Sequence, residues 1–533
     1  MQSARAMDRA AGPLADGERL IVRGQVQGVG FRPTVWRVAS QLGLTGSVRN
    51  TAEGVAITVW GENRSHFADR LVSALPPLAR IDTLERTTVS GIPPEAFTIA
   101  PSETGAARAA ITPDVAVCGA CVSEIADPTA RRQAYPFTNC TDCGPRFSIQ
   151  QAVPYDRHNT TMASFALCKD CQAEYDNPAD RRFHAEPIAC PNCGPKASLE
   201  WLGENTHRPP LDGKDPVAEA ARLLKAGFIV AIKGLGGIHL ACDATQADAV
   251  QRLRTRKGRE GKAFALMARD TTVIARHAKL SADNTALLTA PSAPIVLFEA
   301  LAGTLPDAIA PGLDTLGFML PYTPLHVLLM EGFETPIVMT SGNRSGAPQV
   351  IDNDEARIRL AGLADAALLH NRPIARRIDD SVVRVDCGAA RVLRRARGFA
   401  PIPLALPEGF DGTAPVLAMG SELKNTFCLT KDGEALLSHH MGDLEDAHTH
   451  QDTAHNLALY ADLFQHTPAV VAVDLHPDYL STKRGRDLAG SRPVVAVQHH
   501  HAHIAACLAE NGRPAGAPPV VGIAMDGLGL GPD

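Results

Sequence analysis

The chain has 533 residues, of which 45% are hydrophobic and 21% are charged, a globular composition that excludes disorder, collagen and coiled coil as the main architecture. Its formal net charge of −6 argues against a nucleic-acid-binding surface that covers the whole molecule. No apolar run approaches the roughly 18 residues of a membrane span and the N-terminus lacks the apolar core of a secretory signal, so we expect a cytoplasmic protein. The length predicts about three to five domains. We expect these domains to be α/β and α+β in class, from the elements described below.

Residues 17–103 are predicted to form a small α+β domain. The strand LIVRGQV is followed by a glycine-rich loop and by a helix from Arg32 to Gln41. The segment TGSVRNTAEGVAITVWG is typical of a hairpin, HFADRLVSALPP is a second helical pattern, and a last strand follows near AFTIA. This order of strands and helices predicts a ferredoxin-like fold.

The loop between the first strand and the first helix is a candidate anion site. It consists of Gln27, Gly28, Val29, Gly30 and Phe31. Its backbone N–H groups can converge on an anion at the helix N-terminus, and the Arg32 guanidinium adds charged donors. The sequence VRGQVQGVGFR followed by SVRNTAEG resembles the acylphosphatase family. The resemblance implies that Arg32 binds an acyl phosphate and Asn50 orients the attacking water; the alternative is a domain that only binds.

Residues 110–200 contain a tandem duplication of one cysteine-rich unit. CGACVSEIADPTARRQAYPFTNCTDCGP aligns with CKDCQAEYDNPADRRFHAEPIACPNCGP, 50 positions later. Each unit has two Cys-x-x-Cys pairs separated by 18 residues, which is the spacing of a four-thiolate zinc site. The cysteines are Cys118, Cys121, Cys140 and Cys143 in the first unit, and Cys168, Cys171, Cys190 and Cys193 in the second.

We expect these eight thiolates to hold two structural zinc ions. Disulfides are the first alternative, but cytosolic thiols stay reduced. Iron–sulfur clusters are the second, and the duplicated zinc-ribbon spacing argues against them. Four thiolates leave no open position for chemistry, so the role of the zinc is predicted to be structural. The spacing does not decide whether ligation stays within a repeat or crosses between repeats.

Residues 211–405 are predicted to form an α/β domain with a nucleotide site. VAEAARLLKAG is an amphipathic helix with a glycine stop, and FIVAIKG is a buried strand followed by a glycine-rich turn. Guanidinium groups, ammonium groups, hydroxyls and bare amides together suit a nucleoside triphosphate, although each basic cluster alone is more typical of a solvated helix face. The candidate residues are Arg256, Lys257, Lys262, Thr340, Ser341, Asn343 and Arg395.

These features occur in the order found in the YrdC/Sua5 family, which makes carbamoyl-adenylates from ATP. The resemblance lies in KGLGG, R-x-R-K-x-R-x-x-K, PYTPLH and TSGN-x-SG. It implies that the seven candidate residues contact the nucleotide or the carbamoyl group. His239 and Asp243 are further candidates for the pocket, with a histidine satisfied within the core as the alternative for His239.

Residues 413–533 are predicted to form the first lobe of an actin-like fold. Two strands, PVLAMGS and TFCLT, flank a turn and are followed by helices and then by the strands VVAVDLH and VVAVQ. A last strand, VVGIAMDG, is expected to end at Asp526. His499 and His503 share one helix face and can bind one ion. The alternative for the histidine run is a surface cluster or an affinity tag. HHHAH and GIAMDGLGLG resemble the Kae1-like carbamoyl-transfer domain, which implies that His499, His503 and Asp526 hold iron or zinc beside ATP.

The four segments, taken in order, resemble the HypF family of hydrogenase-maturation carbamoyltransferases. The resemblance implies hydrolysis of carbamoyl phosphate to carbamate, and activation of carbamate by ATP, with Mg²⁺, to carbamoyl-adenylate and pyrophosphate. It also implies transfer of the carbamoyl group to the C-terminal cysteine of the maturation protein HypE. The product is the precursor of the cyanide ligand of [NiFe]-hydrogenase.

The sequence stops at GLGLGPD, within the expected phosphate loop. Actin-like folds enclose ATP between two lobes, so residues 413–533 are expected to be the N-terminal lobe alone. We interpret the chain as a fragment, a truncated gene product or half of a split protein, which lacks part of the machinery for the final transfer.

Two other classes of protein agree less well with the sequence. A threonylcarbamoyl-adenylate enzyme of tRNA modification has no use for an acylphosphatase domain, and the acidic charge balance argues against tRNA binding. A non-catalytic zinc scaffold or DNA-binding zinc finger predicts a basic stripe around the cysteines, and residues 118–193 are mixed in charge.

Overall fold

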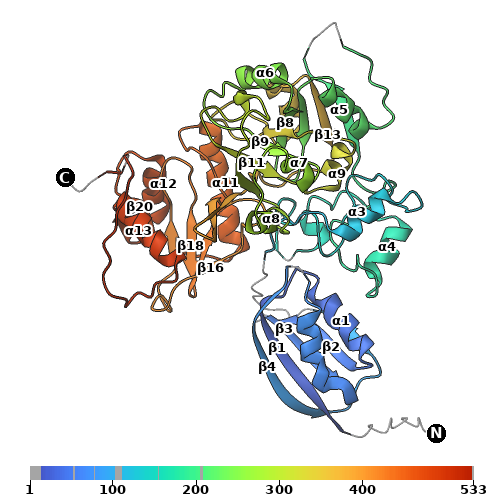
Figure 1. The fold of residues 1–533 in the computed structure, drawn as a ribbon. Coiled ribbons are helices and arrows are strands. Elements are labelled where there is room, and N and C mark those ends of the chain that lie inside the picture. Colours follow the sequence, from blue (N-terminus) through green and yellow to red (C-terminus); the bar gives the residue numbers. More distant parts are fainter. Residues whose placement is uncertain are drawn as a thin grey trace, which may run out of the picture. The chain divides into compact units, whose positions relative to one another are not determined.

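The structure is a computed structural model that describes residues 14–51, 54–76, 78–101, 111–153, 155–203, 208–527 and 529–530. Its regular elements form three sheets with flanking helices, and the segment from residue 111 to residue 196 has short helices and long loops (Figure 1). Within these ranges no helix is both long and apolar enough to cross a membrane.

The N-terminal domain is a five-stranded sheet with two helices. Its strand order is β4-β1-β3-β2-β5, and β1 runs antiparallel to both β3 and β4. Side chains of one sheet face, such as Leu20, Val48 and Ile57, pack with Val35 and Phe67 of the helices. The first four strands have the order of the predicted ferredoxin-like fold. The elements are β1 (Ala15–Gln25), α1 (Phe31–Gln41), β2 (Thr45–Thr51), β3 (Gly54–Trp60), a 3₁₀ turn (Glu62–His66), α2 (Phe67–Ser73), β4 (Arg80–Gly91) and β5 (Phe97–Ile99).

Strand β4 was not predicted from the sequence. The strand near AFTIA, predicted to be the last of the domain, is β5, which pairs in parallel with β2. Strand β4 lies at the sheet edge, and most of its side chains are exposed. An exposed edge strand lacks the alternation of apolar and polar residues from which a strand is recognised.

The cysteine-rich region repeats one local structure. Helices α3 (Gly119–Ala126) and α4 (Lys169–Asp176) begin directly after the first cysteine of each unit. A 3₁₀ turn (Arg157–Asn159) lies between the two units. The region is joined to the middle domain by backbone hydrogen bonds, from Val117 N–H to the Tyr322 carbonyl at 3.0 Å and from Ala375 N–H to the Ser148 carbonyl at 2.8 Å.

The middle domain is a mixed ten-stranded sheet covered by helices on both faces. The strand order is β15-β14-β10-β11-β9-β12-β8-β7-β13-β6. One core packs α6 and α10 against the sheet, and the other packs α5 and α9. The elements are β6 (Ala197–Trp201), α5 (Pro216–Lys225), β7 (Val230–Lys233), β8 (Ile238–Asp243), α6 (Ala247–Lys257), β9 (Ala265–Met267), α7 (Thr271–Ile274), α8 (Ala282–Leu288), β10 (Ile295–Glu299), a 3₁₀ turn (Asp307–Ile309), β11 (Thr315–Met319), α9 (Pro324–Met330), β12 (Ile337–Ser341), α10 (Asn353–Arg359), β13 (Ala366–His370), β14 (Val382–Asp386) and β15 (Ala389–Arg394).

The C-terminal domain is a six-stranded sheet with the order β16-β19-β18-β17-β20-β21. Helix α11 packs its buried face on this sheet through Leu457 and Tyr460. The same core includes Phe147 of the cysteine-rich region and Ile378 of the middle domain, so apolar packing runs without a break through all three. The elements are β16 (Leu404–Ala405), β17 (Val416–Ala418), β18 (Cys428–Lys431), β19 (Glu434–Leu437), α11 (Ala447–Leu463), β20 (Val470–Asp474), α12 (Leu480–Ala489), β21 (Val494–Val497) and α13 (His499–Glu510).

The predicted last strand, VVGIAMDG, is wrong. Residues 520–527 form no strand, and β21 is the edge of the sheet. Val521, Ile523 and Met525 are 93%, 75% and 95% exposed, so the apolar residues that suggested a strand are not buried against any of the described elements.

Candidate metal centres and active-site cavity

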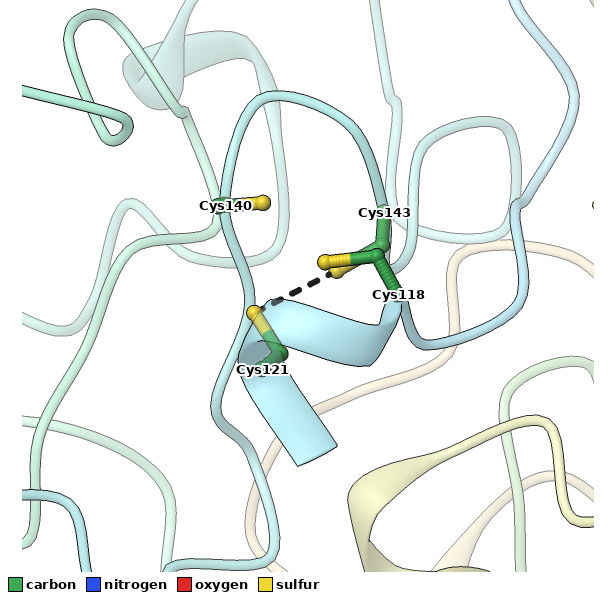
Figure 2. Close-up of side chains that lie close together, drawn as sticks. All are labelled: Cys118, Cys121, Cys140 and Cys143. Carbon is green, nitrogen blue, oxygen red and sulfur yellow. Dashed lines mark hydrogen bonds between the residues drawn. The ribbon is translucent and has the colours of Figure 1, made fainter. Parts of the chain in front are cut away.

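Eight cysteines form two separate clusters, one in each repeat. Cys118, Cys121, Cys140 and Cys143 make the first, and Cys168, Cys171, Cys190 and Cys193 make the second. The four sulfur atoms of each cluster lie within 4.8 Å of one another. Figure 2 shows the first cluster. Cys118 and Cys121 lie at the start of α3, Cys140 and Cys143 lie on a loop, and the four sulfur atoms gather in one place. The structure thus places ligation within each repeat, the point that the spacing left open.

The clusters have the dimensions of tetrahedral zinc sites. The Sγ atoms of Cys121 and Cys143 are 3.6 Å apart, and those of Cys190 and Cys193 are 3.7 Å apart. Zinc–sulfur bonds of about 2.3 Å in a tetrahedron put neighbouring sulfurs about 3.8 Å apart. Four thiolates therefore fit one structural zinc ion in each repeat.

Two arginines at equivalent positions each donate a hydrogen bond to a backbone carbonyl of the other repeat. Arg132 of the first repeat donates from Nε to the carbonyl of Ala189, the residue before Cys190, at 2.7 Å. Arg182, which stands 50 positions after Arg132, donates from Nε to the carbonyl of Asn139, the residue before Cys140, at 3.0 Å. Both arginines are buried. Each repeat therefore supports the second cysteine pair of the other.

The N-terminal loop has the conformation expected of an anion cradle. Gly28 and Gly30 have φ of 70° and 75°, a left-handed conformation that favours glycine. Gly30 is the N-cap of α1, which places Arg32 in the first turn of the helix. The Gln27 amide donates to the carbonyls of Thr51 at 3.1 Å and Gly54 at 2.9 Å, so the loop is tied to the end of β2.

Asn50 lies at this same end of β2. Its Oδ1 atom is buried and has no hydrogen-bond partner among the described residues. A buried amide oxygen without a partner is an acceptor available to a bound water. The roles of Arg32 and Asn50 stay predictions.

A cavity of about 430 Å³ lies between the middle domain and residues 424–452 of the C-terminal domain. Its walls carry both charges. The basic residues are Lys257, Arg259, Lys262, Arg377, Arg394 and Lys424, and the acidic residues are Asp379, Asp380, Asp443 and Asp452. Lys257, Lys262, Thr340, Ser341, Asn343 and His239, all candidates from the sequence, also line it.

Lys257 joins the basic cluster to the Thr340–Asn343 loop. It is the last residue of α6, which ends at Gly258 with φ 63°. Its ammonium group donates to the carbonyls of Ser341 at 2.5 Å and Asn343 at 2.7 Å, and to Asn343 Oδ1 at 2.6 Å. Burial lowers the pKa of Lys257 to about 7.

Three of the candidate residues lie away from the cavity. Arg256 pairs with Asp365 at 2.8 Å, because neighbours on a helix point about 100° apart and Lys257 is the one that faces the cavity. Arg395 donates to the Ile402 carbonyl at 2.5 Å, while Arg394 lines the cavity. Asp243 accepts from the Thr245 N–H at 2.9 Å.

The acidic wall of the cavity was not foreseen from the sequence. Asp380 accepts from Arg397 Nε at 2.9 Å and lies 3.0 Å from His239 Nε2. The Arg397 guanidinium also lies 3.6 Å from the centre of the Tyr322 ring. The charge of Arg397 keeps the pKa of the buried Asp380 carboxyl well below its usual range.

A histidine–carboxylate hydrogen bond and an ion pair join the C-terminal domain to this wall. His440 Nδ1 lies 2.8 Å from Asp379 Oδ2, and Arg377 is paired with Asp452 of α11. Figure 1 shows α11 beside the middle domain. The hydrogen bond from His440, together with the charge of Arg394, lowers the pKa of Asp379 to about 2 although burial opposes this.

A third candidate metal site lies at the start of α13. His499 Nε2 and His503 Nε2 lie 3.0 Å and 3.3 Å from Asp526 Oδ2, so the structure brings the three predicted ligands together. His499 Nδ1 lies 2.7 Å from Oδ2 of the buried Asp474, at the end of β20. Two imidazole nitrogens and a carboxylate oxygen suit iron or zinc, and the half-exposed position leaves room for further ligands.

Each part of the chain matches a known family. Residues 18–99 match the acylphosphatase model, residues 117–150 and 167–200 the HypF finger, residues 222–396 the Sua5/YciO/YrdC model described as telomere recombination, and residues 411–510 the HypF Kae1-like domain.

Curated relatives match along the whole chain. Carbamoyltransferase HypF of Rhodobacter capsulatus is 55% identical over 97% of this chain and 68% of its own length. Carbamoyltransferase HypF of Synechocystis is 46% identical over 96% of this chain and 66% of its own length. The chain thus spans about two thirds of the length of these relatives.

Solved structures agree with the whole-chain match. Full-length HypF in a phosphate- and nucleotide-bound form is 43% identical, with a TM-score of 0.89 over 98% of this chain and 68% of that one. HypF of T. kodakarensis is 40% identical, with a TM-score of 0.83 over 93% of this chain and 64% of that one. By sequence and by fold, this chain belongs to the HypF family of carbamoyltransferases.

Proposed function

We propose that the chain hydrolyses carbamoyl phosphate and activates the resulting carbamate with ATP to carbamoyl-adenylate. These are the early steps of a carbamoyl transfer to the C-terminal cysteine of HypE. The transferred carbamoyl group is the precursor of the cyanide ligand of [NiFe]-hydrogenase. The observation that carries the proposal is the cavity of about 430 Å³, whose basic residues and Thr340–Asn343 loop suit a triphosphate. Membership of a family that includes a nucleotide-bound structure supports it.

Hydrolysis is assigned to the N-terminal loop. The amides at the start of α1 and the Arg32 guanidinium hold the phosphoryl group, and Asn50 Oδ1 accepts a hydrogen bond from water. The water oxygen attacks phosphorus, and the bond from phosphorus to the carbamoyl oxygen breaks. The products are inorganic phosphate and carbamate.

Activation is assigned to the cavity. A carbamate oxygen attacks the α-phosphorus of ATP, and the bond to the β-phosphate breaks to release pyrophosphate. Lys257, Arg259 and Lys262 offset the negative charge that develops on the phosphates, together with Mg²⁺ bound to the nucleotide. The position between two domains limits the access of water to the reactive adenylate.

The C-terminal domain is assigned to the transfer step. A thiolate of HypE attacks the carbamoyl carbon, and AMP leaves. His499, His503 and Asp526 would hold iron or zinc, which supplies a positive charge close to the leaving nucleotide. Residues of this chain are thus assigned to hydrolysis, to activation and to the metal-binding part of the transfer site.

The test is ATP–pyrophosphate exchange that depends on carbamoyl phosphate, measured on the zinc-loaded chain. We expect exchange in the wild type and its loss in Arg32→Ala and Lys262→Ala. Carbamate supplied directly should restore exchange to Arg32→Ala, because that variant lacks only the first step, and should leave Lys262→Ala inactive.

Two results would contradict the proposal. One is absence of exchange in folded, zinc-loaded protein. The other is exchange that requires threonine and bicarbonate in place of carbamoyl phosphate, which would assign the chain to threonylcarbamoyl-adenylate synthesis.

A further inference from the structure

The acidic wall of the cavity contains two adjacent carboxylates that are held from different domains. Asp380 is held within the middle domain, by His239 Nε2 and Arg397 Nε. Asp379 is held from the C-terminal domain, by His440 Nδ1 at 2.8 Å. The His440 backbone N–H also donates to the Arg395 carbonyl at 3.0 Å, so this residue is fixed on the middle domain at two points.

Asp379 is an anion on the wall of a cavity whose cations suit the phosphates of a nucleotide. Lys257 and Arg394 line the same cavity, and both interact electrostatically with the Asp379 carboxylate. Attraction between opposite charges is strong where water is scarce. A carboxylate released from His440 would therefore turn to these cations and compete with the phosphates of a nucleotide.

We propose that His440 is a positioning residue for the adenylation step. It keeps Asp379 away from the cations that bind the triphosphate, so the middle domain binds ATP well only while the C-terminal domain is in place. The inference rests on the proposed function of the cavity, and it gives the C-terminal domain a role before any transfer occurs. The advantage is chemical, because a carbamoyl-adenylate made in an open site would be lost to water.

The test compares five variants of the chain, one of which is Asp379→Asn alone. In His440→Ala, the KM for ATP in pyrophosphate exchange should rise about tenfold, and kcat should stay nearly unchanged. A tenfold rise in KM is the size expected for loss of one hydrogen bond to a charged group. His440→Asn places an amide donor close to the Nδ1 position and should stay near the wild type. Asp379→Asn/His440→Ala lacks the competing charge and should regain the low KM. His455→Ala, a change at an exposed position on α11, is the matched control.

Binding of a non-hydrolysable ATP analogue, measured by calorimetry, gives the same comparison without turnover. A wild type that binds the analogue but shows no exchange contradicts the proposed function, while the effect of His440→Ala on the dissociation constant still tests the positioning role. Circular dichroism melting shows that each variant is folded.

Three results would overturn the inference. The first is an unchanged KM and an unchanged dissociation constant in His440→Ala. The second is a rise that Asp379→Asn does not reverse, which would mean that His440 only docks the domain. The third is complete loss of exchange in Asp379→Asn alone, which would mean that Asp379 acts on the substrates directly.

Discussion

Lys257 combines a buried position with three oxygen acceptors. The carbonyls of Ser341 and Asn343 and the Asn343 side chain all accept from its ammonium group, so it both shapes the loop and contributes charge to the cavity. Because burial lowers its pKa to about 7, this charge is lost within the range in which enzymes are usually assayed.

Affinity for ATP should therefore depend on pH. As pH rises through about 7, Lys257 loses its proton, and the KM for ATP in pyrophosphate exchange should rise several-fold between pH 6.5 and 9. Lys257→Met has no charge to lose, so its KM should be high and nearly constant across this range. Equal pH dependence in the two proteins would assign the titration to another group.

Asp474 contacts His499, one of the three proposed metal ligands of the third site. Its Oδ2 atom lies 2.7 Å from His499 Nδ1, which leaves Nε2 facing His503 and Asp526. A carboxylate that accepts from one imidazole nitrogen fixes the other as the ligand.

Asp474→Asn should weaken metal binding at this site by about tenfold to a hundredfold, because an amide does not fix the tautomer in this way. Competition with a coloured chelator, on protein that keeps its two cysteine-bound zinc ions, measures the change. Asp526→Ala removes one of the three proposed ligands, so its metal affinity is the low reference value for this site. Binding as tight in Asp474→Asn as in the wild type would contradict this role.

Among the elements, the two cysteine units depend on each other through Arg132 and Arg182. Each arginine binds the carbonyl just before the second cysteine pair of the other unit. Loss of one arginine should therefore loosen the metal cluster of the repeat to which it does not belong.

Arg182→Ala should release the zinc of the first cluster about ten times faster, and Arg132→Ala that of the second, in line with the loss of other residues that support metal ligands. Cadmium-113 resonances of the two clusters, assigned with Cys140→Ser and Cys190→Ser, show which cluster is perturbed. A change confined to the arginine's own repeat would be the contrary result.

Parts of the fold and site were predictable because their signals are local. The cysteine spacing predicted both metal clusters, and the helix of VAEAARLLKAG is found as α5 with its N-terminus capped by Asp215. The TSGN loop and Lys262 were predicted to share a site, and both line the cavity.

The remaining features depend on contacts that no local pattern carries. Asp379 and His440 are 61 residues apart in sequence, and their pairing follows from the docking of two domains. The phase of α6 decides that Lys257 rather than Arg256 faces the cavity. Strand β4 lacks buried alternation because it is an edge strand, and VVGIAMDG has the composition of a strand but no pairing partner among the described elements.

At the scale of the molecule, the cysteine-rich region, the middle domain and the C-terminal domain share packing. Phe147 is completely buried, with its ring centre 5.6 Å from that of Tyr460 and 4.1 Å from the Arg376 guanidinium. One aromatic side chain therefore contacts all three parts.

Phe147→Ala should lower the free energy of unfolding by about 3–5 kcal/mol, the usual cost of removing a buried phenylalanine. Near-ultraviolet circular dichroism in urea measures this, with Leu393→Ala at a half-exposed position as the control. If the three parts unfolded in separate transitions, with only one of them shifted, the shared packing would not make them one cooperative unit.

The hydrogen bonds from Arg132 and Arg182 to the opposite cysteine unit also bear on biosynthesis. Arg182 lies 42 residues after Cys140, because it belongs to the later copy of the unit. At translation rates of about 5–20 residues per second, the first four cysteines emerge roughly 2–8 seconds before the residue that steadies them. If zinc binds the first unit during that interval, it does so before the hydrogen bond from Arg182 to the Asn139 carbonyl can form.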